Sequence, residues 1–125
     1  MASLLHNNSA QTFKTRIDDV DENGVTVGVL DASNFTAAEY RIFSLDCTTV
    51  LVTATLAAGD IAVEADTDSE GNPINVFRST LTEAKMLDTI VPQGQYIHQF
   101  EVTNSGGLKL PPVFQETVSI LRACD

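Results

Sequence analysis

The chain has 125 residues, of which 17 are acidic and 7 are lysine or arginine, so its formal charge at neutral pH is −10. This length corresponds to about one domain, which can bury a core without disulfides or a bound metal. An acidic surface repels phosphate, so it argues against binding to nucleic acid or to anionic membranes and suits a neutral or basic protein partner. The charge could equally serve solubility alone.

The first eleven residues precede the first segment with a strand pattern. We interpret residues 1–11 as an arm that docks on a neighbouring subunit, and residues 12–125 as the domain. The alternative is an arm folded back on its own domain. The arm lacks the basic start and long apolar core of a secretory leader, and no apolar run approaches the ~20 residues that cross a bilayer. We therefore expect a protein that works where it is made or leaves inside a larger particle.

Alternation of apolar and polar residues predicts short strands along most of the domain. The spacing of about 8–12 residues between strands, with turn residues between them, is typical of an antiparallel β-sandwich. In the second strand, Val25, Val27 and Val29 share one face. The predicted strands cover residues 12–17, 25–29, 35–43, 50–56, 61–65, 74–81, 96–103 and 113–121.

Turn signals separate these strands. Residues 18–24 end in Asn23-Gly24, a pair that accepts the positive φ angles of a tight hairpin. Pro111 and Pro112 precede the last strand and would blunt a sheet edge, because proline cannot donate to a β-ladder.

A short helix is predicted over about residues 82–90. Thr82 is a suitable N-cap, and the apolar side chains of Leu87 and Ile90 would pack beneath the helix. Pro92 ends it and begins a corner, Pro-Gln-Gly-Gln-Tyr, that leads to Tyr96 and the next strand. We expect this element to cross one end of the fold and take the chain from one sheet to the other.

Two acidic loops resemble the opening of a calcium-binding loop. They begin at Asp19 (Asp-Val-Asp-Glu-Asn-Gly) and at Asp66 (Asp-Thr-Asp-Ser-Glu-Gly). A helix-loop-helix calcium site also needs a glutamate at the twelfth position, where this chain has Leu30 and Phe77. We therefore interpret both loops as β-turns and predict no metal site.

The remaining candidates for catalysis are two histidines and two cysteines. His98 lies on an apolar face of the strand 96–103, where a packed histidine is more common than a base or a ligand, and His6 lies in the arm. Cys47 and Cys124 fit no metal spacing and no disulfide framework, so we expect free thiols. The sequence contains no Gly-x-Ser-x-Gly nucleophile motif. We predict a protein that is not an enzyme, with no catalytic residues and no cofactor.

Several segments form a recognisable set, although each alone is unspecific. They are residues 30–43, the strand 49–56, Gly59-Asp-Ile61, the turn 81–87, and Pro92-x-Gly-x-Tyr96 followed by Phe100-Glu-Val102. In order and spacing, over roughly residues 12–122, the set resembles small immunoglobulin-like virion proteins of tailed bacteriophages, including the N-terminal domain of upper baseplate proteins. The resemblance implies an all-β fold, an immunoglobulin-like antiparallel β-sandwich of seven to eight strands with one short helix (about 82–90), in which Tyr96 occupies the position of a tyrosine corner.

The resemblance also implies a function and a location. The protein would be a non-enzymatic structural component of the virion, assembled in the host cytoplasm. It would dock on capsid, neck, tail or fibre subunits through its arm and sheet edges, and form a homo-oligomer in the particle, without nucleic acid or membrane. A capsid decoration (cement) protein and a tail or baseplate adaptor both fit.

A different class of function is recognition of a glycan or protein on the host surface. Such sites favour exposed aromatic side chains. The chain has no tryptophan, and its two tyrosines, Tyr40 and Tyr96, lie on predicted core faces.

Overall fold

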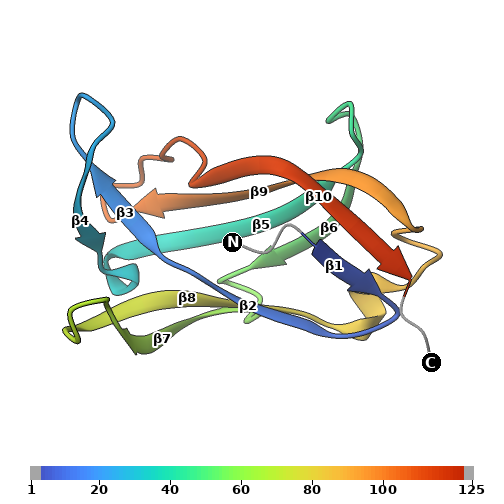
Figure 1. Cartoon of the computed structure of the whole chain (residues 1–125), viewed down its shortest axis with the longest axis horizontal. Coiled ribbons are helices and arrows are strands. Elements are labelled where there is room, and N and C mark those ends of the chain that lie inside the picture. Colours follow the sequence, from blue (N-terminus) through green and yellow to red (C-terminus); the bar gives the residue numbers. More distant parts are fainter. Residues whose placement is uncertain (1–3, 123–125) are drawn as a thin grey trace.

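The fold is all-β. The computed structural model describes residues 4–122, apart from the side chain of Val20. This part of the chain forms ten strands in three sheets and two 3-10 helices, with no α-helix (Figure 1). The strands are β1 (Leu4–Asn7), β2 (Gln11–Thr15), β3 (Ile17–Val20), β4 (Thr26–Leu30), β5 (Phe35–Phe43), β6 (Val50–Thr55), β7 (Ile61–Thr67), β8 (Pro73–Leu81), β9 (Gly94–Asn104) and β10 (Phe114–Arg122); the helices are η1 (Ala32–Asn34) and η2 (Glu83–Met86).

Two of the sheets face each other. The larger has the strand order β1-β10-β9-β5-β6 and curls like half of a barrel over the second, which has the order β2-β8-β7 (Figure 1). The third sheet is the two-stranded β3–β4 ribbon, which continues from β2 at one end of the molecule. β1 pairs with β10 in parallel, and the other strand pairs are antiparallel.

The core fills the space between the two facing sheets and is rich in aromatic rings. Phe77 of β8 and Phe100 of β9 have ring centroids 5.7 Å apart, and Phe13 of β2 meets Tyr40 of β5 edge-on at 5.0 Å. Phe77 is completely buried. Full burial of such an apolar side chain contributes about 1.5–3 kcal/mol, so these contacts hold the two sheets together.

All eight predicted strands occur, but the predicted total of seven to eight is wrong because there are ten. The additional strands are β1, within the predicted arm, and β3, which begins at the last residue of the predicted strand 12–17 and otherwise lies within the predicted turn 18–24. β1 has only four residues, which is too short for alternation to be recognised. β3 carries Asp18 and Asp19, whose charges favour a turn in sequence reasoning although here they pair antiparallel with β4.

The predicted helix over 82–90 is also corrected. Only Glu83–Met86 is helical, and it is a 3-10 helix, in which the Thr82 side chain accepts a hydrogen bond from the backbone N–H of Lys85 as predicted. The chain then forms a turn, with the N–H groups of Ile90 and Val91 donating to the Leu87 carbonyl. Met86 and Val91 are the buried residues here, whereas Leu87 and Ile90 are exposed.

Residues 4–7 pack on their own domain in the single chain. Leu5 and Asn7 are buried, and the Asn7 side-chain amide donates to the Val91 carbonyl at 3.1 Å. Asn8 takes a left-handed conformation (φ 56°), and its N–H donates to the Met86 carbonyl at 2.7 Å. β1 therefore closes one side of the curled sheet and lies next to η2. Docking of residues 1–11 on a neighbouring subunit stays a prediction.

Within residues 4–122, no helix has the length and apolar character required to span a bilayer.

Candidate docking site

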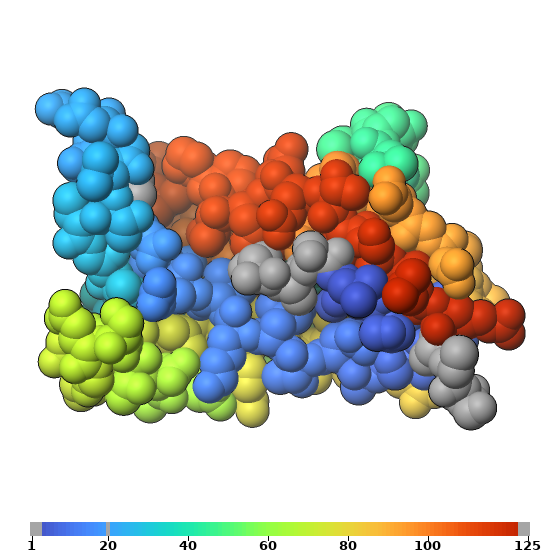
Figure 2. All heavy atoms as spheres, viewed as in Figure 1, coloured from blue at the N-terminus to red at the C-terminus, as the bar shows by residue number. Residues whose placement is uncertain are grey.

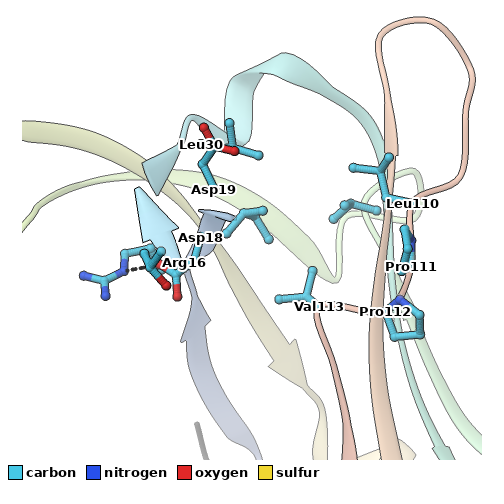
Figure 3. A pocket seen from close by; sticks show the side chains of 11 residues that line it. Arg16, Asp18, Asp19, Leu30, Leu110, Pro111, Pro112 and Val113 are labelled. Carbon is cyan, nitrogen blue, oxygen red and sulfur yellow. Dashed lines mark ion pairs between the residues drawn. The ribbon is translucent and has the colours of Figure 1, made fainter. Parts of the chain in front are cut away.

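A groove of about 430 Å³ opens at the end of the molecule that carries the β3–β4 ribbon. It lies between this ribbon and the segment 110–113, which leads into β10 (Figure 3). The two walls are far apart in sequence and are brought together because the ribbon stands beside the start of β10. The groove is lined by Arg16, Ile17, Asp18, Asp19, Thr26, Leu30, Val102, Leu110, Pro111, Pro112 and Val113.

One wall is the edge of a strand. The four consecutive residues 16–19 all line the groove. Successive side chains of a strand point to opposite faces, so three consecutive lining residues of β3, Ile17–Asp19, indicate that the backbone of this strand borders the groove as well as its side chains; Thr26 and Leu30 of β4 extend the wall. In the described part of the chain β3 pairs only with β4, so its opposite edge carries unpaired backbone donors and acceptors.

The other wall is held away from β3 by two prolines. The backbone N–H of Leu110 donates to the Val102 carbonyl at 3.0 Å, and that of Val113 donates to the Phe100 carbonyl at 2.8 Å. Between these anchors, Pro111 and Pro112 have no N–H to donate. This wall therefore follows β9 and cannot form a ladder with β3, which leaves the groove open. Both prolines lie outside the strands, between β9 and β10, and their blunting of a sheet edge stays a prediction.

The end of the molecule around the groove is acidic. In the groove, Asp18 pairs with the Arg16 side chain at 3.4 Å, which Figure 3 shows on the side of β3 away from the proline wall. The tip of the ribbon and the β7–β8 loop lie at this same end (Figure 1). Together with residues next to these segments, this end of the molecule holds eight of the chain's 17 acidic residues: Asp18, Asp19, Asp21, Glu22, Asp31, Asp66, Asp68 and Glu70.

The ribbon also exposes apolar side chains. The predicted shared face of Val25, Val27 and Val29 does not face the core: Val25 is 57% exposed and Val27 is 62% exposed. Figure 2 shows the ribbon standing out from the body of the molecule. Leu108, in the loop between β9 and the proline wall, is also exposed. Clusters of exposed apolar residues at one place on a soluble protein are characteristic of interaction surfaces.

The two calcium-like loops use their carboxylates in turns. Asp21 accepts hydrogen bonds from the N–H groups of Asn23 and Val25, and Asp68 accepts from those of Glu70 and Asn72. The hydrogen bond from the backbone N–H of Asn72 is the largest cause of the lowered pKa of Asp68. Within residues 4–122, no group of three or more His, Cys, Asp or Glu side chains is placed to hold a metal ion.

His98 belongs to a buried polar network in the core. It is 1% exposed; its Nδ1 lies 2.9 Å from the Tyr40 hydroxyl, and its Nε2 lies 3.2 Å from Oε1 of Glu116. A carboxylate can only accept, so Nε2 carries the proton and the Tyr40 hydroxyl donates to Nδ1. Burial raises the pKa of Tyr40, so this hydroxyl keeps its proton. His98 is packed in the core, as predicted, and both of its ring nitrogens have partners.

Cys47 and His6 are not brought to this network. Cys47 is exposed in the loop between β5 and β6, with a left-handed backbone (φ 60°). Its neighbour Asp46 accepts hydrogen bonds from Ser44 and Thr48, which lower the pKa of Asp46 to about 2. His6 is exposed on β1, and Cys124 lies outside the described residues.

The neutral state of His98 should make stability depend on pH. Burial is the largest influence and lowers the pKa of His98 below its ordinary 6.5, against the opposing effect of Glu116. The unfolded chain therefore takes up this proton first as the pH falls, and the free energy of unfolding should decrease from about pH 6.5 downward. Each unit by which the two pKa values differ contributes about 1.4 kcal/mol.

Urea unfolding of the wild type and His98→Gln between pH 7.5 and 5.5 measures this effect. The wild type should lose stability across this interval while His98→Gln stays nearly level. Equal slopes for the two proteins would show that His98 is not the group responsible.

Sequence reasoning missed the groove, although some of its signals were present. The proline pair and the valine stripe were both recognised, but their positions next to each other depend on β3. Because Asp18 and Asp19 were interpreted as turn residues, no strand edge was expected at this place.

Comparison with known proteins adds no relative. No protein-family model matches this chain, and a search among curated proteins returned no match.

Proposed function

We propose that this chain is a non-enzymatic structural protein that docks onto other protein subunits. The resemblance described above extends the proposal to a component of a tailed-phage virion, which binds capsid, neck, tail or fibre subunits and is present there as a homo-oligomer. Decoration of the capsid and an adaptor role in the tail or baseplate are both compatible with it.

The observation that carries the proposal is the β3–β4 ribbon. It combines an unpaired strand edge with a stripe of exposed valines, and natural proteins usually protect such edges with charges, prolines or covering segments. The edge of β6 is protected by a side chain: the Lys85 ammonium donates to the Thr53 carbonyl at 2.8 Å. An edge left open beside an apolar groove is a site where another chain can add a strand.

We further propose that the fold is an immunoglobulin-like antiparallel β-sandwich. Two facing sheets with an aromatic core support this classification, and so does the corner at Pro92. There the Tyr96 hydroxyl donates to the Pro92 carbonyl at 2.5 Å, a bond back to the chain a few residues upstream, as in a tyrosine corner. The β3–β4 ribbon and the parallel β1–β10 pair are additions to that plan.

The virion proposal is tested by quantitative mass spectrometry of density-purified particles from cells that produce this chain. We expect a fixed number of copies per particle. Val27→Asp should reduce incorporation by about tenfold, which corresponds to about 1.4 kcal/mol of lost binding. Leu87→Asp is the control, because Leu87 is exposed near η2, away from the ribbon. A chain found only in the soluble lysate would overturn the proposal.

A further inference from the structure

We propose that the groove binds an extended segment of a partner protein, which adds as a strand along the free edge of β3. This segment places an apolar side chain between Leu30 and Leu110 and a lysine or arginine next to Asp19. The inference rests on the docking function proposed above and specifies the chemistry of the partner.

The extended conformation follows from the β3 wall. A strand edge offers alternating backbone N–H and C=O groups, and an added strand can pair with all of those that face it. The proline wall cannot provide this pairing from within the chain, because neither Pro111 nor Pro112 has an N–H. The space left between the two walls, about 430 Å³, is open to an incoming chain.

The apolar requirement follows from the floor and sides of the groove. Leu30 comes from the base of the ribbon, Leu110 and Val113 come from the proline wall, and all three are partly buried against the core. Figure 3 shows the side chains of Leu30, Leu110 and Val113 directed into the space between the walls. An alternating segment can present its apolar side chains to these residues and its polar side chains to solvent.

The basic requirement follows from charge. Asp18 is paired with Arg16, but among the ion pairs within residues 4–122 none involves Asp19. The proline wall adds carbonyl acceptors but no N–H donors at Pro111 and Pro112. Eight acidic residues at this end repel a second copy of the same chain, whose own charge is −10. A cationic segment from a different protein is the complementary occupant.

The experiment is a selection from a displayed library of random 12-residue peptides. Peptides that bind the folded wild-type protein are retained, and peptides that also bind the Thr26→Trp variant are removed. Thr26 is exposed and lines the groove, so the indole should fill the groove without disturbing the core. We expect enriched peptides with alternating apolar residues and at least one lysine or arginine. The most enriched peptide, synthesised and titrated into ¹⁵N-labelled protein, should shift the amide signals of β3, Thr26 and residues 110–113.

Matched variants test the two interactions separately. Asp19→Asn should weaken binding of the selected peptide about fivefold, and more at low salt than at high salt, whereas Asp88→Asn near η2 should not change it. Thr26→Trp should abolish binding, and Thr12→Trp on the outer face of β2 should leave it intact. Circular dichroism establishes that all four variants are folded.

Three results of the peptide experiment would overturn the inference. They are enrichment of the same peptides on the Thr26→Trp variant, no enrichment above that variant, and amide shifts away from the groove. Self-association of the wild type through the groove, seen as a rise of mass with concentration that Thr26→Trp removes, would assign the site to a second copy instead. Particle incorporation is measured independently of peptide binding. The proposed docking function can therefore hold when the peptide inference fails, and the peptide inference can hold when the chain is absent from particles.

Discussion

Replacing Leu5 with alanine is expected to lower the free energy of unfolding of the isolated chain by about 2–5 kcal/mol. Leu5 is only 3% exposed and packs in the hydrophobic core, so truncation of its side chain leaves a cavity. Urea denaturation at neutral pH measures the loss. A loss of this size would show that the N-terminal strand stabilises its own domain.

Leu4 provides the matched control, because it is the adjacent residue of the same strand and is 48% exposed. Leu4→Ala should change the free energy of unfolding by no more than about 0.5 kcal/mol. Similar small effects for both substitutions would mean that β1 does not pair with β10 and pack against the core in solution. That result would favour an arm that reaches its position only on a neighbouring subunit.

Replacing Tyr40 with phenylalanine should cost about 1–3 kcal/mol. The ring keeps its edge-on contact with Phe13, but Nδ1 of the buried His98 loses its hydrogen-bond donor. An unpaired polar atom at this depth carries the penalty of its removal from water. The measurement is the same urea titration, at pH 7.5, where His98 is neutral in the folded and unfolded chains.

Tyr96→Phe removes the other tyrosine hydroxyl under matched conditions. The carbonyl of Pro92 lies near the surface, so water can replace the lost donor, and the expected cost is about 0.5–1.5 kcal/mol. Equal costs for the two substitutions would indicate that His98 finds another donor, such as a water molecule, when Tyr40 is changed.

Alternation predicted the strands that contribute one face to the core. In β9, for example, His98, Phe100 and Val102 are all buried as the pattern requires. The same rule failed for the ribbon, where Val25 and Val27 also alternate with small or polar residues but face solvent. Periodicity shows that residues share a face, whereas tertiary packing decides whether that face is covered.

The short elements were hidden for a different reason. The spacing of Leu87 and Ile90 fits a helix, but the 3-10 helix ends at Met86, the chain continues as a turn, and the buried positions are Met86 and Val91. Packing against distant segments of the chain, not local helix propensity, decides which of these residues are buried. The candidate site depends on that same long-range register, since it joins residues 16–19 to residues 110–113 across most of the chain.

The side-chain cap on β6 has a consequence for how sheets could grow from this molecule. Lys85 occupies the Thr53 carbonyl, and the Asp60 carboxylate accepts from the Thr55 N–H at 3.4 Å, so two ladder positions on that rim are already taken. A strand that paired along the outer edge of β6 would have to displace both of these side-chain hydrogen bonds. If partner strands add at β3 as proposed, sheet growth that alternates between β3 and β6 would therefore be hindered at β6.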